Sequence, residues 1–419
     1  MNTRRILIIV ASIVVGLGVL AAVYFIFFAP SSPTLTTGGE NPFGNTGSND
    51  VTGGNTNGNT DTGIISQGAG KKLSARFIQV TAAPVVAGFA AVYVPAPKAG
   101  QTATTSTSTP AGTLAPTDDT DIRYIDRASG NVYSYKFHAD ASTRLSNKTV
   151  PGIQTAAWVA DGSLAFTQYL SKDDAGDEHI ETYALPANGE GGYFLERDLD
   201  EVTTSASSTV FSLVKNSSGS IGTTARSDGS NVKTAFSSVL SSLSVRFAGK
   251  TFVATTKASS GVPGYSFLVD ASGNFSRLLG PLSGLATLPS PSGKSVLFSY
   301  TDGGTPRLAV LSVATRTITA LPTPTFAEKC VWSPDETNVF CAVPKKISGT
   351  LPDDWYQGAV RFADRIWKID LVSRLAVLTI DPSNVTGTDI DVQNLTLDPK
   401  ADILVFMNKR DSSLYAFDL

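Results

Sequence analysis

One short pattern recurs along the chain, and it constrains the fold more than any other feature. Its clearest copy is Cys330–Val343, where an apolar strand is followed by the polar turn Ser333–Asn338 and by a second apolar strand. The turn contains Pro and Asp, which preset or hydrogen-bond a reversing backbone. The pattern therefore predicts an antiparallel β-hairpin.

The hairpin pattern recurs at a nearly constant interval. Aligning the copies on the tryptophan of the clearest one gives anchors at Trp158, Thr203, Val245, Pro289, Trp332 and Leu397. The intervals are 45, 42, 44, 43 and 65 residues, so the last interval contains an insertion. A unit of four short strands that repeats every 40–45 residues or so is typical of β-propeller blades.

A third and a fourth strand, joined by a short turn, are expected after each hairpin. Ile122–Asp126 with Val132–Phe137 fits this pattern in the first blade, and Phe267–Asp270 with Phe275–Leu279 fits it in the fourth. These segments are rich in Val, Phe, Tyr and Thr, as half-buried pleated strands require.

The turn Trp332-Ser-Pro-Asp335, followed by an apolar strand, resembles the WD40-like repeats of bacterial TolB-type β-propellers. It also resembles the propeller domain of prolyl-oligopeptidase-type peptidases. The resemblance covers most of residues 71–419, although only residues 332–343 are a close copy, and Asp335-Glu336 stands where the family has Asp-Gly. The resemblance implies a propeller that binds other proteins, and it implies no catalytic residue.

Residues 71–419 are predicted to form an all-β propeller of seven four-stranded blades that closes by strand exchange. Leu414–Leu419 is predicted to be a third strand with no fourth after it, and Leu73–Val80 a fourth strand with no blade before it. Pairing the two completes the last blade and removes exposed sheet edges. Because residues 82–148 are irregular, eight blades are an alternative, and six fit the spacing less well.

The first 28 residues predict a membrane anchor. Residues 1–5 carry two arginines, and residues 6–28 are an uncharged apolar run of 23 residues, long enough to span a bilayer as one transmembrane helix. No further Lys or Arg occurs before Lys71, so the positive-inside rule predicts a cytoplasmic N-terminus and an extracytoplasmic domain. We expect an uncleaved single-pass anchor in the cell membrane, and a cleaved signal peptide is the alternative.

Residues 29–70 are rich in Gly, Thr, Asn and Ser and contain little that could be buried. Such a composition cannot offset the entropy of ordering the chain, so a flexible linker is predicted between anchor and propeller.

Composition and motifs argue against several classes of function. The net charge is −3 and there is no basic block, which disfavours nucleic-acid binding. The chain has two histidines and no Gly-x-Ser-x-Gly motif. Asp173–Glu181 is acidic but lacks the alternating spacing of a calcium loop. We therefore expect no catalytic residue, no cofactor and no metal.

The two cysteines predict a disulfide. Folding the hairpin about its central turn places Trp332 opposite Val339 and Cys330 opposite Cys341. Directly opposed residues lie within disulfide reach, and an exported domain meets an oxidising compartment. The alternative is two small buried thiols that pack against the tryptophan.

Long connections predict which face of the propeller is functional. In a four-stranded blade, the connection between the second and third strands leaves from the face opposite the other two turns. All the long connections are predicted to be of this kind, namely Pro95–Asp121, Ser171–Glu178 and Pro344–Asp364. Trp355 and Tyr356 in the last one are expected to be exposed and to anchor a partner. The alternative is that both pack into their own blade as a local lid.

The expected function is binding. A membrane anchor, a linker and a ring without a recognisable nucleophile or base favour a non-catalytic binding or scaffold module for a protein or glycan partner in the cell envelope. One alternative is an enzyme that acts on cell-envelope glycan, which needs carboxylates converging on the mouth of the central channel. The other is a structural component of an envelope or pilus assembly.

Overall fold

The computed structural model describes residues 66–67, 70–96 and 117–419. The predicted cytoplasmic segment 1–5, the membrane span 6–28 and nearly all of the predicted linker lie outside these residues. No helix among the residues described is long and apolar enough to cross a membrane.

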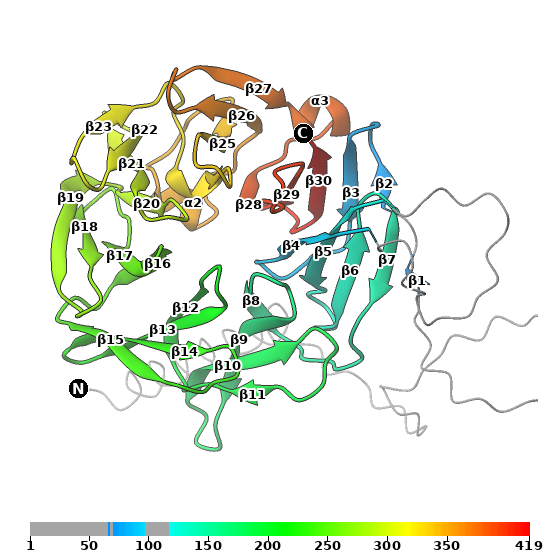
Figure 1. Ribbon diagram of the computed structural model, residues 1–419, viewed down its shortest axis with the longest axis horizontal. Coiled ribbons are helices and arrows are strands. Elements are labelled where there is room, and N and C mark those ends of the chain that lie inside the picture. The colour runs from blue at the N-terminus through cyan, green and yellow to red at the C-terminus, as the bar shows by residue number, and fades with distance from the viewer. Residues whose placement is uncertain (1–65, 68–69, 97–116) are drawn as a thin grey trace, which may run out of the picture. The chain divides into compact units, whose positions relative to one another are not determined.

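In the described residues, seven antiparallel sheets are arranged in a ring (Figure 1). From the innermost to the outermost strand, blade one contains β4 (Ala90–Val94), β5 (Asp119–Ile125), β6 (Val132–Lys136) and β7 (Ala141–Arg144). Blade two contains β8 (Ile153–Trp158), β9 (Leu164–Lys172), β10 (Glu178–Pro186) and β11 (Tyr193–Phe194). Blade three contains β12 (Leu199–Thr204), β13 (Thr209–Asn216), β14 (Gly219–Arg226) and β15 (Lys233–Ser238).

The remaining blades repeat this order. Blade four contains β16 (Leu243–Ala248), β17 (Thr251–Thr256), β18 (Pro263–Val269) and β19 (Phe275–Ser283). Blade five contains β20 (Ala286–Pro289), β21 (Ser295–Asp302), β22 (Thr305–Ser312) and β23 (Ile318–Ala320). Blade six contains β24 (Cys330–Trp332), β25 (Asn338–Pro344), β26 (Asp364–Asp370) and β27 (Ala376–Ile380). Blade seven contains β28 (Val392–Leu397), β29 (Ile403–Asn408), β30 (Leu414–Asp418) and β3 (Phe77–Thr81). The prediction of seven four-stranded blades is confirmed.

Strand exchange closes the ring as predicted. β3 from the start of the propeller pairs with β30 from its end, with Phe77 opposite Phe417. A fifth strand extends two blades, because β2 (Lys71–Lys72) pairs with β3 and β1 (Ser66–Gln67) pairs with β7. Two residues of the predicted linker therefore pair with a sheet.

Each anchor of the repeat lies in an innermost strand, and the two anchor tryptophans tie neighbouring blades together. The indole N–H of Trp158 donates to the carbonyl of Gly88, 3.2 Å away and just before β4. That of Trp332 donates to the carbonyl of Leu288 in β20 at 3.0 Å. The repeated tryptophan thus links its own blade to the preceding one while its ring is buried.

Blade one differs from the prediction. Residues 122–126 and 132–137 were expected to contain its third and fourth strands, but β5 and β6 are the second and third. The long connection that begins at Pro95 therefore joins the first strand to the second, not the second to the third. The prediction was wrong here because this insertion separates the two hairpin strands, which removes the tight Pro/Asp turn that identifies the hairpin in other blades.

The hairpin turn of blade six explains why Glu336 replaces the glycine of the family pattern. Glu336 has a left-handed backbone (φ 57°), a conformation that glycine adopts more readily. Its carboxylate accepts hydrogen bonds from the backbone N–H of Ser292 at 2.5 Å and from the Ser292 hydroxyl at 2.6 Å. These contacts with the neighbouring blade offset the backbone cost.

Candidate functional site

The longest described insertion lies in blade six, and it forms a small core of its own. Residues 345–363 join β25 to β26, the second and third strands, as predicted, and contain the helical turn α2 (Asp353–Tyr356). Leu351, Trp355 and Phe362 of the insertion form this core together with Phe326, which directly precedes the short helix before β24. The ring of Trp355 stacks on that of Phe326 with centroids 5.5 Å apart.

A buried ion cluster fixes this insertion to blade seven. Lys329 lies at the end of the short helix η1 (Ala327–Lys329), and its Nζ lies 2.8 Å from Asp364 Oδ2 and 2.7 Å from Asp391 Oδ1. All three side chains are 0% exposed. Trp355 Nε1 donates to both carboxylate oxygens of Asp391 at 3.1 Å. Burial raises the pKa of Asp364 to about 6, although the ammonium beside it acts in the opposite direction.

The structure corrects the expected exposure of Trp355. This side chain is only 5% exposed, so it packs inside the insertion, as the local-lid alternative predicted. Tyr356 is 39% exposed, and its hydroxyl donates to Glu328 Oε2 at 2.5 Å. Of the two candidate partner-binding residues, only Tyr356 presents substantial surface. Their role in binding a partner stays a prediction.

Tyr356 lies at the mouth of the central channel. In Figure 1, α2 lies at the inner end of blade six beside β20. Tyr356, Glu328, Lys409 and Arg246 line a cavity of about 640 Å³ there. Lys409 follows β29; its ammonium donates to the carbonyl of Trp355 and lies 4.0 Å from the centre of that indole ring. Polar groups from blades four, six and seven therefore converge on one cavity.

Desolvation shifts two pKa values at the mouth. Glu328 is exposed to the cavity but surrounded by protein, and this desolvation raises its pKa. Desolvation also lowers the pKa of Lys409. Both shifts are in the direction of the neutral form of the group.

A second cavity of about 390 Å³ lies along the channel and shares two lining residues, Arg246 and Asn394, with the first. Arg246 on β16 forms an ion pair with Glu201 on β12. Glu201 Oε2 also accepts a hydrogen bond from the backbone N–H of Val245 at 2.7 Å. Glu201 therefore ties blade three to blade four and forms part of the channel wall.

None of the sequence patterns pointed to the charged channel residues Glu201, Arg246, Glu328 and Lys409. A usable signal existed for two of them, because Glu201 and Arg246 lie within innermost strands close to the repeat anchors. A charge at that position, where a neighbouring copy of the repeat has an apolar or small residue, indicates a side chain that faces the channel. Glu328 and Lys409 lie outside regular strands and offered no such signal.

The two cysteines lie beneath the same wall. The predicted register is confirmed, with Cys330 opposite Cys341 and Trp332 opposite Val339. The sulfurs are bonded at 2.12 Å, and Cys330 also lines the cavity at the mouth. Formation of this disulfide in the protein's own compartment stays a prediction.

Two of the three long connections share the face of the channel mouth. Residues 173–177 join β9 to β10, the second and third strands of blade two, as predicted. The connection after Pro95 joins the first strand to the second, so its two described ends lie at the opposite face, while residues 97–116 lie outside the described residues. Near its end, Asp118 pairs with Lys400 at 2.6 Å, and Lys400 belongs to the first-to-second turn of blade seven.

Comparison with known proteins supports the fold and goes no further. No protein-family model matches the sequence. No curated protein matches it either. Among solved structures, an oligogalacturonate lyase in complex with manganese is 8% identical, with a TM-score of 0.51 over 72% of this chain and 86% of the lyase.

TolB and other propeller proteins are also among the similar structures. TolB from Acinetobacter baumannii is 16% identical with a TM-score of 0.40, over 60% of this chain and 59% of the TolB chain. The β-propeller domain of the Trilobed protease from Pyrococcus furiosus is 7% identical with a TM-score of 0.44, over 72% of this chain and 89% of that domain. At these identities the likeness is one of fold alone.

Proposed function

We propose that this chain is a membrane-tethered, extracytoplasmic propeller that binds a protein or glycan partner of the cell envelope without catalysing a reaction. The binding site in this proposal is the channel mouth. The observation that carries it is the insertion 345–363, which a buried ion cluster holds in place and which sets Tyr356 beside Glu328 and Lys409 over a cavity of about 640 Å³.

The chemistry of the mouth suits a polar ligand. The lining offers a phenol, a carboxyl, an amine and the amides of Gln393 and Asn394. Such groups bind ligands that present several hydroxyl or amide groups, which describes both a glycan and a peptide main chain. The volume lies within the range of about 300–1,000 Å³ that is usual for ligand sites.

The membrane tether in this proposal is supported by the sequence. The uncharged run 6–28 is long enough to cross a bilayer, and residues 29–70 would hold the propeller away from its surface.

The test is capture of the partner by the full-length protein in intact cells. After crosslinking, we expect Tyr356→Ala and Lys409→Ala to lose the partners that the wild-type protein captures. The matched control is Phe194→Ala, which removes an aromatic that is 60% exposed on the outermost strand of blade two. Direct titration of the captured partner, or of its glycan, into detergent-purified full-length protein should reproduce the loss. Wild-type affinity in Tyr356→Ala protein that has a normal melting temperature would refute this site.

A second candidate is an enzyme that acts on envelope glycan, and one observation favours it. Two carboxylates do converge on the channel, because Glu201 and Glu328 line adjoining cavities and Arg246 lines both. The raised pKa of Glu328 suits a general acid. Incubating envelope glycan with wild-type and Glu328→Gln protein separates the two functions. Release of reducing ends by the wild type alone would favour the enzyme over the binding module.

A further inference from the structure

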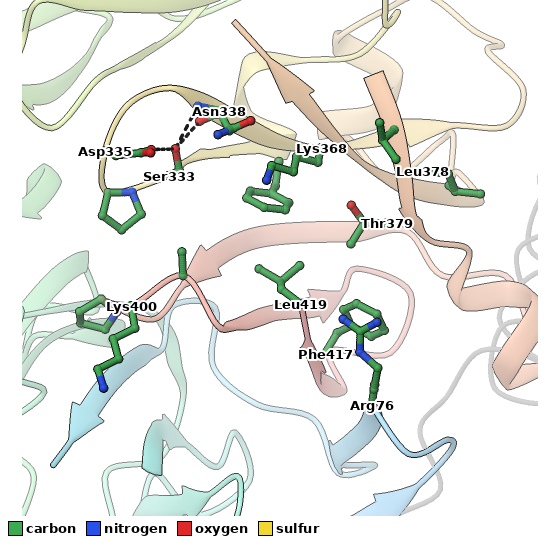
Figure 2. A pocket seen from close by; sticks show the side chains of 15 residues that line it. Arg76, Ser333, Asp335, Asn338, Lys368, Leu378, Thr379, Lys400, Phe417 and Leu419 are labelled. Carbon is green, nitrogen blue, oxygen red and sulfur yellow. Dashed lines mark hydrogen bonds between the residues drawn. The ribbon is translucent and has the colours of Figure 1, made fainter. Parts of the chain in front are cut away.

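A third cavity, also of about 640 Å³, forms a groove between blades six and seven (Figure 2). The turns between the first and second strands of both blades line it, so it lies on the face opposite the channel mouth. We propose that this groove and the free edge of β27 together bind an extended acidic peptide of a partner protein, which pairs with β27 as an additional strand.

The wall on blade six is a row of three side chains. Phe340 on β25 lies opposite Lys368 on β26, and Lys368 lies opposite Val377 on β27. Directly opposed residues of neighbouring strands project from the same side of a sheet. All three line the groove, so this row faces blade seven.

The wall on blade seven is formed by Phe417, Leu419 and Arg76. Figure 2 shows Leu419 near the middle of the groove, with Arg76 beside the ring of Phe417. Phe417 is buried on β30, and Arg76 directly precedes β3, the fourth strand of its blade, while β27 on the facing wall is the outermost strand of blade six. The groove therefore opens toward the outer rim of the ring.

Each wall carries a cation that lies over a phenylalanine ring. The guanidinium of Arg76 lies 4.9 Å from the centre of the Phe417 ring, and the ammonium of Lys368 lies 5.9 Å from that of Phe340. In the part of the chain that the structure describes, neither cation forms an ion pair with a carboxylate. Both are therefore available to an anionic ligand.

Asp335 and Lys400 also line the groove. Asp335 accepts hydrogen bonds from the hydroxyls of Ser333 at 2.5 Å and Thr337 at 2.7 Å, which hold its pKa down at about 2, so it stays ionised. It belongs to the turn between the first and second strands of blade six, whereas Lys368 and Val377 lie on the third and fourth. Lys400 pairs with Asp118 at 2.6 Å. Beside the two outer strands a ligand meets an apolar floor and two cations without an ion-pair partner among the described residues, which complements acidic groups on an apolar peptide.

The outer edge of blade six is open and apolar. Among the described strands, β27 pairs with β26 alone. Val377 is 64% exposed and Leu378 is 45% exposed. In the turn before them, Val372 is 86% exposed and Leu375 is 67% exposed. An open apolar edge is a template for an added strand. This propeller already accepts such strands at two other outer edges, where β1 pairs with β7 and β2 with β3.

Strand pairing also sets the pattern of the peptide. Side chains of an added strand alternate between the two faces of the sheet. Those on the side of Val377 point toward the groove and its cations, which favours Asp or Glu. Those on the other side lie with Leu378, which is opposite Trp367 and is 45% exposed, and this favours apolar residues. The occupant is an extended segment in which acidic and apolar residues alternate.

The experiment uses full-length protein in detergent and a fluorescent peptide that alternates Glu with Val. Fluorescence anisotropy should show binding that weakens as salt is added. Arg76→Glu combined with Lys368→Glu should weaken it about tenfold or more. The matched control is Lys233→Glu, which changes an exposed lysine on the outermost strand of blade three and should leave binding unchanged. Should the double Glu variant fail to fold, the Arg76→Gln and Lys368→Gln pair gives the same comparison.

Two further peptides test the mode of binding. A Lys–Val peptide should not bind, and a Glu–Val peptide with alternate backbone nitrogens methylated should bind far more weakly because it cannot pair with a strand edge. Failure of the wild type to bind the Glu–Val peptide, or equal binding of the methylated one, would overturn the proposal. Two other results would also overturn the proposal. If the wild type bound anionic phospholipid vesicles and the double variant did not, the occupant would be a membrane. If the wild type self-associated in sedimentation and the double variant did not, the occupant would be a second copy of the chain.

Discussion

Lys329 Nζ lies 2.7 Å from Asp391 Oδ1, and neither side chain is accessible to solvent. The two residues belong to different blades and are 62 positions apart in the sequence. Asp391 also accepts the indole N–H of Trp355 and the backbone N–H of Phe362. The insertion at the channel mouth is thus positioned by a buried contact that a ligand never touches.

Replacing Lys329 by Met should strongly lower the free energy of unfolding of the protein. The change leaves the carboxylates of Asp364 and Asp391 buried without their cation, a loss of about 3–5 kcal/mol in the free energy of unfolding. Urea unfolding measures it, with Lys233→Met as an exposed control expected to change that free energy by less than about 0.5 kcal/mol. A loss of under about 1 kcal/mol in Lys329→Met would show that the cluster does not stabilise the fold.

Asp364 should make stability depend on pH in the sense opposite to an ordinary surface carboxylate. Its pKa is about 6 in the folded protein, against about 3.9 for an unfolded aspartate. As the pH falls from 7 to 4, Asp364 is protonated in the folded state before it is protonated in the unfolded state. The contribution of Asp364 to the free energy of unfolding therefore grows, to at most about 3 kcal/mol. It is lost again as the pH rises through 6.

Urea unfolding of the wild type and of Asp364→Asn at pH 5 and pH 7 isolates this effect. The wild type should gain stability relative to the variant at the lower pH. An identical difference between the two proteins at both pH values would contradict the expected titration.

The two aromatic residues of α2 should behave differently. Trp355→Ala empties a buried site and should lower the free energy of unfolding by about 3–5 kcal/mol. Trp355→Phe keeps most of the packing but removes one of the N–H donors to the buried Asp391, at a cost of about 1–3 kcal/mol. Tyr356→Ala should leave the melting temperature within a few degrees of the wild type. Thermal unfolding of the three variants checks this order, and a Tyr356→Ala loss equal to that of Trp355→Ala would place Tyr356 in the core.

Protein isolated from its own compartment should contain the Cys330–Cys341 disulfide. Peptide mapping without reduction detects the bond, and two free thiols would disprove it. The bond closes a short loop, so replacing both cysteines by Ala should cost about 2–3 kcal/mol of stability. Reduction of the disulfide in the wild type should lower the stability by a similar amount. Because reduction leaves both cysteine side chains in place, this measurement controls for the packing that the alanine substitutions remove.

Protease added to the outer side of the cytoplasmic membrane should release a soluble propeller by cutting within residues 30–70. We expect this because residues 6–28 are proposed as an uncleaved anchor with a cytoplasmic N-terminus. Complete protection of the propeller, or a mature N-terminus near Pro30, would contradict the proposed topology.

The sequence by itself determined the features that local signals encode. The tight turn Ser333–Asn338 and its copies predicted the repeat interval and the register that opposes Cys330 and Cys341, because a hairpin's register follows from its own turn. Seven blades followed from that interval, with eight as an alternative. The unpaired strands at the two ends of the propeller predicted the closure between β3 and β30. Where an insertion replaced the turn, in blade one, the local signal was lost and the strand assignment failed.

Only the tertiary structure decided what the channel mouth is made of. Glu201 meets Arg246 across 45 residues, and Lys329 meets Asp391 across 62, so each contact joins neighbouring blades that no local pattern relates. The burial of Trp355 depends on the same distant carboxylate. A repeat sequence specifies each blade through short-range turns, but the groups that face the channel and the grooves are brought together only when the ring closes.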